Sequence, residues 1–288
     1  MSVPPAPAGR PITESPAGAS SVAPPANTPT GPAVTGSRMG PRRPGQNRSL
    51  VAALLAALVA ALLAWPATAQ PALRPGIGEV DPRRPVNPEE SPWHALGRVQ
   101  LEVGGRCTGA LIGPRLMLTA AHCLVAPRSR ALVQPGTIHV LLGYVRGTAR
   151  GHARATAYRI GPGFDPSKGG PAAADWAILS LDTPLGTPDR ILPLLAAPPA
   201  PRAPLMLGGY QQDRPEVIIA DTGCRLLGLS AGGPGAMLLH DCAGTRGSSG
   251  APLLARGPEG SWAIAGIASR VAASAALGAA VPASAIRP

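Results

Sequence analysis

Residues 116–123 read Leu-Met-Leu-Thr-Ala-Ala-His-Cys, an apolar run that enters a turn of small residues and ends on a histidine and a cysteine. The apolar part predicts a buried strand. A general base must be held within hydrogen-bond reach of the proton it takes. Cys123 can fix the turn beside His122 through a disulfide with Cys107. This stretch therefore makes His122 the candidate general base.

The remaining four histidines give no comparable signal. They stand alone in polar or strand contexts, and we interpret them as structural surface or strand residues: His94, His139, His152 and His240.

Two further stretches can complete a nucleophilic site. Asp175 begins Asp-Trp-Ala-Ile-Leu-Ser-Leu, and an acid at the head of a buried strand is costly unless it is paired, for instance with a histidine N–H. Residues 246–252 read Arg-Gly-Ser-Ser-Gly-Ala-Pro, which predicts a tight turn. Gly247 and Gly250 supply the backbone freedom for it. A serine becomes a nucleophile only when its hydroxyl is exposed on a tight turn and a base lies beside it, which makes Ser249 the candidate nucleophile.

The order of these residues along the chain separates two fold families. In α/β-hydrolases the acid and the histidine follow the nucleophilic serine. No histidine and no aspartate follows Ser249 here, which excludes that arrangement. The order His122, Asp175, Ser249 is that of the two-barrel serine peptidases.

On these stretches, residues 92–282 resemble a trypsin-like serine peptidase of the chymotrypsin fold. Cys107-Thr-Gly-Ala-Leu-Ile-Gly followed by Leu-Thr-Ala-Ala-His-Cys is similar to that family's histidine signature, disulfide included. The resemblance implies that Ser249 attacks the peptide carbonyl, that His122 transfers the proton, and that Asp175 orients the imidazole. It also implies an oxyanion hole formed by the backbone N–H groups of Gly247 and Ser249, with no metal and no cofactor.

The chain departs from the family pattern at several positions. Ser248 stands where pancreatic members have an aspartate, so the ion pair with a newly cut N-terminus cannot form. The short second half and Ser248 resemble the bacterial glutamyl-endopeptidase-like branch, although Ala268 occupies the place of the histidine that this branch often uses to bind an acidic residue. By position, Ala243 and Ser269 are candidate substrate-binding residues. Cleavage preference stays open.

The pattern of strands predicts an all-β fold of two antiparallel β-barrels, packed together with the active site in the cleft between them. Short strand candidates follow one another without a convincing long helix. Four prolines within residues 195–204 exclude a central strand there and indicate a linker. We therefore expect an arm and first barrel over residues 70–194, which contain His122 and Asp175, and a second barrel over residues 205–288, which contain Ser249.

The N-terminal region has the composition of a leader. Residues 1–48 are rich in Pro, Ala, Gly, Ser and Thr and predict a disordered segment, in which Met39 is a possible true start. Residues 49–69 combine a basic flank, an apolar run and an Ala-Thr-Ala exit, which are the parts of a signal peptide. Cleavage after Ala69 would give a secreted or periplasmic protein, whereas a retained segment would anchor it to a membrane.

Charge and cysteine count bound the function further. The formal charge is +11, and residues 1–69 carry five Arg and one Glu, which leaves +7 for the rest. The basic residues are dispersed and aromatic residues make up 3% of the chain, which argues against a nucleic-acid surface. Four cysteines in an exported chain predict two disulfides. Three pairings are possible, and we expect the sequence-local one, Cys107–Cys123 with Cys224–Cys242.

The leading hypothesis is a secreted, monomeric serine endopeptidase that acts on proteins or peptides. The alternatives are a non-catalytic binding protein on a trypsin-like fold and a membrane-anchored peptidase.

Overall fold

The computed structural model describes residues 52–58, 74–230, 233 and 235–287. Residues 52–58 form a helix within the apolar run that was predicted as part of a signal peptide. The remainder of that run, the cleavage site and residues 1–48 lie outside the described residues. Within the described part of the chain, no helix is both long and apolar enough to cross a membrane.

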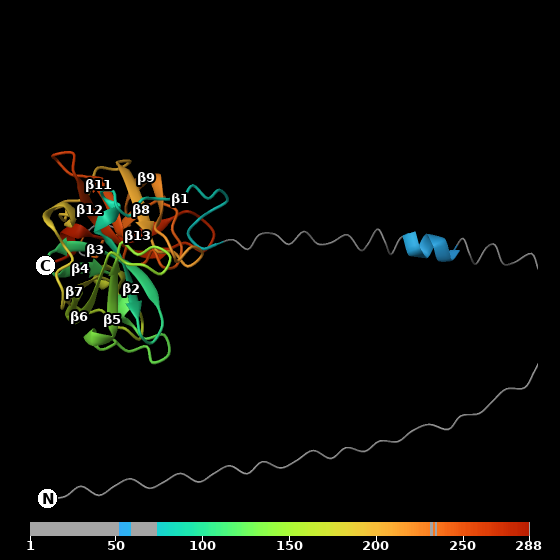
Figure 1. Cartoon of the computed structure of the whole chain (residues 1–288). Helices are drawn as coiled ribbons and strands as arrows, with labels where there is room; N and C mark the ends of the chain where they lie inside the picture. The colour runs from blue at the N-terminus through green and yellow to red at the C-terminus, as the bar shows by residue number, and fades with distance from the viewer. Residues whose placement is uncertain (1–51, 59–73, 231–232, 234, 288) are drawn as a thin grey trace, which may run out of the picture. The chain divides into compact units, whose positions relative to one another are not determined.

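Six antiparallel strands form the first barrel, which closes in the order β2-β3-β4-β7-β6-β5 because β5 pairs back onto β2 (Figure 1). Burial alternates along β5, where Ile138, Val140 and Leu142 are buried and the residues between them are less so. The strands of this barrel are β2 (Leu96–Leu101), β3 (Arg106–Gly113), β4 (Leu116–Thr119), β5 (Ile138–Leu142), β6 (Gly151–Ile160) and β7 (Ala177–Leu181).

A second antiparallel barrel follows in the order β9-β10-β13-β12-β11-β8 and closes where β8 pairs with β9. Its strands are β8 (Pro204–Gly209), β9 (Ile219–Leu229), β10 (Leu238–His240), β11 (Pro252–Arg256), β12 (Trp262–Val271) and β13 (Gly278–Pro282). The predicted all-β, two-barrel fold is confirmed.

The N-terminal arm attaches to the second barrel, although it precedes the first barrel in the chain. Its short strand β1 (Arg84–Pro85) pairs antiparallel with β9, beside which it is drawn in Figure 1. The Val86 N–H continues the pairing by donating to the Ile218 carbonyl over 3.2 Å. The sequence grouped this arm with the first barrel by position in the chain, whereas its hydrogen bonds connect it to the second.

Short 3₁₀ helices occupy the turns between strands. They are η1 (Trp93–Ala95), η2 (Ala121–Leu124), η3 (Pro135–Thr137), η4 (Ala172–Ala174), η5 (Pro188–Arg190) and η6 (Ala283–Ala285). Two of them position candidate site residues, because His122 lies in η2 and Asp175 directly follows η4.

The structure forms the two sequence-local disulfides. Cys107 in β3 is bonded to Cys123 in η2, and Cys224 in β9 is bonded to Cys242 just after β10. The first therefore joins strand and turn beside His122, and the second links β9 to the segment that follows its neighbour β10.

We predict that the Cys224→Ser, Cys242→Ser double variant is less stable than the wild type by about 3 kcal/mol, because the disulfide closes a loop of about 18 residues in the unfolded chain. Urea unfolding of the two proteins measures the difference in the free energy of unfolding. A difference below about 0.5 kcal/mol would contradict the loop-closure argument.

Candidate active site

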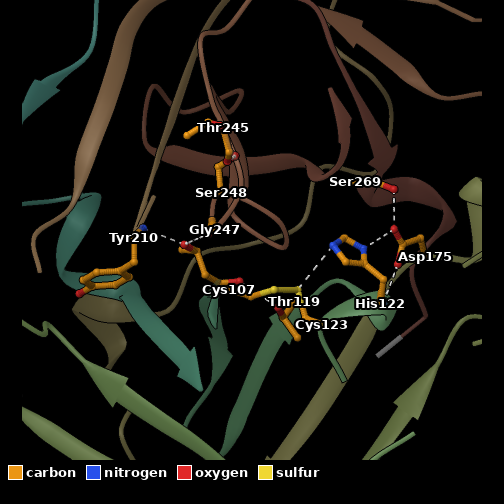
Figure 2. Close-up of a disulfide and its surroundings, with 11 residues drawn as sticks. Cys107, Thr119, His122, Cys123, Asp175, Tyr210, Thr245, Gly247, Ser248 and Ser269 are labelled. Atoms are coloured by element: carbon orange, nitrogen blue, oxygen red, sulfur yellow. Dashed lines mark hydrogen bonds and ion pairs between the residues drawn. A yellow bond between two sulfur atoms is a disulfide. The ribbon is translucent and has the colours of Figure 1, made fainter. Parts of the chain in front are cut away.

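His122 and Asp175 are joined by two contacts, one from the backbone and one from the ring. The His122 backbone N–H donates to Asp175 Oδ1 over 2.8 Å, and His122 Nδ1 lies 2.7 Å from Asp175 Oδ2 (Figure 2). The carboxylate accepts, so the neutral ring carries its proton on Nδ1 and leaves Nε2 as an acceptor. The pair thus fixes both the orientation and the tautomer of the imidazole.

The Asp175 carboxyl is fully buried and receives a third donor from the second barrel. The Ser269 hydroxyl in β12 donates to Asp175 Oδ2 over 2.5 Å, as Figure 2 also shows. Burial by itself would raise the pKa of Asp175, but the hydrogen bonds and charge of His122 and the Ser269 hydroxyl outweigh it and hold the pKa below its ordinary value. The carboxylate is therefore ionised at neutral pH.

Ser249 is partly exposed and is attached through its backbone to the same strand that carries the His122 disulfide. The Thr108 N–H in β3 donates to the Ser249 carbonyl over 3.0 Å. Thr108 follows Cys107, whose disulfide partner Cys123 follows His122. His122 Nε2 lies 4.0 Å from Cys123 Sγ, and no hydrogen bond joins it to Ser249 within the described part of the chain. The structure therefore brings the serine loop and the histidine turn onto one disulfide-linked support without an Oγ–Nε2 hydrogen bond.

The turn before Ser249 leaves two backbone donors free. The N–H groups of Gly247 and Ser249 have no hydrogen-bond acceptor among the described residues, whereas the Ser248 N–H and hydroxyl both donate to the Thr245 carbonyl. Gly247 has a φ of +93°, and its carbonyl accepts from the Thr108 hydroxyl over 2.8 Å. Two unpaired N–H groups at one turn are the kind of donors that an oxyanion hole requires.

Gly250 allows the serine turn to approach the first barrel closely. Its φ is +75°, and a Cβ at this position would clash with the Thr119 hydroxyl and the Thr108 carbonyl. Glycine is needed here both for the backbone conformation and for the space. The sequence signal of glycines around Ser249 thus has a specific structural cause.

A pocket of about 190 Å³ lies beside Ser249. It is lined by Leu207, His240, Thr245, Arg246, Ser248, Ser249, Ala268, Ser269, Arg270 and Val271. A second pocket of about 300 Å³ borders His122 and is lined by Arg130, Lys168 and Arg270 among others. No acidic residue is found among the described residues lining either pocket. Both therefore have a positive character.

Of the two candidate substrate-binding residues, only Ser269 lines the pocket. Ala243 is fully buried, and its N–H donates to Asp221 Oδ2 over 2.9 Å. It is not one of the residues that line the pocket.

His240 is a pocket residue that sequence reasoning missed. It is 1% exposed, and neither ring nitrogen has a hydrogen-bond partner in the described part of the chain. Burial lowers its pKa to about 4, although Asp241 opposes the shift. A lone histidine on a strand carries no sequence signal for such a position, which the curvature of the barrel decides.

The residue groups with metal-ligand spacing do not offer thiolates. Among the residues that the structure describes, two such groups occur, namely Cys107, His122 and Cys123, and Cys224, Asp241 and Cys242. Every cysteine in them is disulfide-bonded. Because a thiolate is the form that binds metal, these sulfurs are poor ligands.

Known proteins share sequence features with the region that contains this site. A family model described as Trypsin matches residues 82–219, which include His122 and Asp175. The glutamyl endopeptidase of Bacillus licheniformis is 29% identical over 126 residues, a match that covers 42% of this chain but only 37% of that relative. Over these matched regions, the chain is similar to the trypsin-like serine peptidases.

Solved structures agree on the fold. A structure of a Glu endopeptidase in complex with MPD has a TM-score of 0.61 and 20% identity, and the match covers 72% of this chain and 93% of that one. Human heparin binding protein has a TM-score of 0.54 and 20% identity, with 70% and 91% covered. At 20% identity, these structures show a shared fold. Together with the family model and the Bacillus licheniformis relative, they confirm the resemblance to trypsin-like serine peptidases of the glutamyl-endopeptidase branch that the sequence indicated.

We predict that His240 makes the fold less stable as the pH falls from about 6.5 to about 4. Its pKa is lower in the folded protein than in the unfolded chain, so the unfolded chain binds the proton first and gains stability through this window. The effect is at most about 1.4 kcal/mol per pH unit. His240→Phe, which keeps a ring but cannot titrate, should flatten the dependence of the unfolding free energy on pH.

Urea unfolding at several pH values between 4 and 7 measures this dependence. The exposed His152 provides the control, and His152→Gln should retain more of the wild-type slope. Identical slopes for wild type and His240→Phe would show that His240 is not held neutral by burial.

Proposed function

We propose that this protein is a serine endopeptidase in which Ser249 is the nucleophile and His122 the general base, while Asp175 orients the imidazole and stabilises its cation. The observation that carries the proposal is the Asp175 carboxylate, buried and bonded to both the ring and the backbone of His122. Such a pair prepares an imidazole to accept a proton. The free N–H groups of Gly247 and Ser249 support the same reaction.

The chemistry follows from these positions. Ser249 Oγ bonds to the carbonyl carbon of the substrate while its proton passes to His122 Nε2. The oxygen of the tetrahedral intermediate becomes negative and is bound by the Gly247 and Ser249 N–H groups, a contribution of about 3–4 kcal/mol per donor. His122 then gives the proton to the leaving amine, and the C–N bond breaks.

Water completes the cycle by the same route. His122 takes a proton from the water as its oxygen attacks the acyl-enzyme, and the proton returns to Ser249 Oγ as the acid product leaves. The missing Ser249–His122 hydrogen bond is compatible with this scheme, because catalytic hydrogen bonds are often long before substrate binds.

For the substrate we propose an acidic side chain in the pocket beside Ser249. Arg246 and Arg270 line this pocket, and His240 lies in its buried wall. A carboxylate would be attracted by the two guanidinium groups. The relative's name, glutamyl endopeptidase, supports the same preference.

We also propose that the protein is exported. The basic flank, apolar run and small-residue exit over residues 49–69 support this, as do two disulfides, which persist in oxidising compartments.

We predict that Ser249→Ala abolishes peptide hydrolysis and labelling by a fluorophosphonate probe, while Ser248→Ala retains labelling because its hydroxyl is directed to the Thr245 carbonyl. Mass spectrometry of the labelled wild type should locate the adduct on Ser249. A folded wild type that neither hydrolyses peptides nor takes the label would support a non-catalytic binding protein.

We predict that wild type cleaves after Glu with a higher kcat/KM than after Gln in otherwise identical peptides. Arg246→Gln should reduce the Glu-to-Gln ratio about three- to tenfold, since a charged hydrogen bond is lost. Arg256→Gln is the matched control, because that side chain stacks on Trp262 and lines neither pocket. Equal rates for Glu and Gln peptides in the wild type would contradict the acidic preference.

A further inference from the structure

A buried arginine in the N-terminal arm lies at the centre of a charge cluster outside the two pockets. The Arg83 side chain is 0% exposed and is bonded to two carboxylates. Its Nε and Nη2 donate to Asp81 over 2.8 and 2.9 Å. Its Nη2 and Nη1 donate to Asp213 over 2.7 and 3.2 Å. The positive charge is thus balanced by two carboxylates that are 20% and 17% exposed, and the bidentate contacts fix the plane of the guanidinium.

Gln211 connects this cluster to the serine turn. Its Oε1 accepts from Arg83 Nη1 over 2.6 Å and from the Thr245 N–H over 2.8 Å. Gln211 is fully buried, and its amide nitrogen donates to the Ile219 carbonyl over 3.3 Å. One oxygen atom therefore joins the arm to the first residue of the turn that leads to Ser249.

The arm and the residues next to Gln211 hold this turn at further points. The Gly244 N–H donates to the Gly76 carbonyl over 2.8 Å, and the Gln212 N–H donates to the Arg246 carbonyl over 2.7 Å. Within the turn, the Thr245 carbonyl accepts from the Ser248 hydroxyl over 2.6 Å. The backbone that presents the Gly247 and Ser249 N–H groups is consequently fixed from the arm side as well as from Thr108.

We propose that Arg83 is a positioning residue for the oxyanion hole: through Gln211 it holds the Thr245–Ser249 turn in the conformation that presents the Gly247 and Ser249 N–H groups. This inference rests on the proposed peptidase function. Ser248 offers a hydroxyl and no carboxylate, so the turn cannot be ordered by an ion pair of its own. The charged group that orders the turn is Arg83 of the arm, and this arrangement requires no charged N-terminal amine.

The physical basis is preorganisation. Backbone N–H groups stabilise a developing oxyanion most when they are fixed before the reaction, because no reorganisation is then needed. If Arg83 is replaced, the Gln211 oxygen loses one of its two fixed donors and the turn gains alternative conformations. The loss should affect the chemical step more than the binding of substrate.

Arg83→Lys tests the proposal against the matched control Arg84→Lys. Lysine keeps the charge but lacks the planar fork that reaches Asp81, Asp213 and Gln211 together. Arg84 is exposed, and its side chain donates only to carbonyls of the arm itself. We expect Arg83→Lys to lower kcat about tenfold or more with KM changed less than twofold, and Arg84→Lys to behave as wild type.

Amide hydrogen exchange provides a readout that does not depend on activity. Residues 244–248 should exchange faster in Arg83→Lys than in Arg84→Lys, while β4 and β7 stay unchanged. If the wild type proves inactive, the proposed function fails. Faster exchange in Arg83→Lys would then still support the role of Arg83 in holding the Thr245–Ser249 turn. A folded Arg83→Lys with the kcat and exchange of Arg84→Lys overturns the inference.

Arg83→Ala adds a rescue test, because it leaves a space the size of a guanidinium. Guanidinium chloride at concentrations below those that unfold the protein should restore part of kcat to this variant and none to Ser249→Ala. Should Arg83→Ala fail to fold, Asp213→Asn replaces it, since it keeps the shape and the Asp81 pair. For Asp213→Asn, a kcat below that of the wild type with an unchanged KM supports the proposal, even if the loss is smaller than in Arg83→Lys. Wild-type kcat and KM for Asp213→Asn overturn the proposal.

Discussion

The Asp175 carboxylate has no access to water, and burying an ionised carboxylate costs free energy unless hydrogen-bond donors compensate for the lost hydration. It stays ionised because donors reach it from both barrels: the ring and backbone of His122 from the first, and the Ser269 hydroxyl from the second. An unpaired charge at this depth would cost several kcal/mol. The relative placement of the barrels is therefore coupled to the charge state of the site, and a shift of one barrel would leave the carboxylate short of donors.

Thr108 is the second junction between the barrels. Its N–H and hydroxyl bond to the carbonyls of Ser249 and Gly247, and its hydroxyl oxygen accepts from the Tyr210 N–H over 2.9 Å. The preceding Cys107 ties the same strand to the turn of His122. One dipeptide of β3 thus supports the base on one side and the nucleophile turn on the other. This explains why the disulfide and the histidine are neighbours in sequence.

Hydrogen bonds from the N-terminal arm also hold the turn that precedes Ser249. Arg83, Gln211 and Thr245 are joined by a buried chain of hydrogen bonds in which Gln211 Oε1 accepts from both of its neighbours. Buried hydrogen bonds are strong in a medium of low dielectric constant, so this chain restricts the backbone that it contacts. The arm belongs to the second barrel by strand pairing, so the barrel that carries Ser249 includes a segment from the start of the folded chain. Sequence distance alone did not indicate this.

The sequence by itself determined the all-β architecture, the three candidate residues and their order, because period-two strands and short-range motifs such as Leu-Thr-Ala-Ala-His-Cys encode local structure directly. It also indicated the sequence-local disulfides, whose cysteines are 16 and 18 residues apart. Tertiary structure alone decided three features: that His240 lies in the pocket wall, that Ala243 does not line the pocket, and that Arg83 contacts the serine turn through Gln211. Each depends on which segments become neighbours when a barrel closes, and the contact of Arg83 with Asp213, for example, joins residues 130 positions apart. Local sequence patterns do not predict contacts over such a distance. In the sequence, the side chains involved cannot be distinguished from ordinary strand or surface residues.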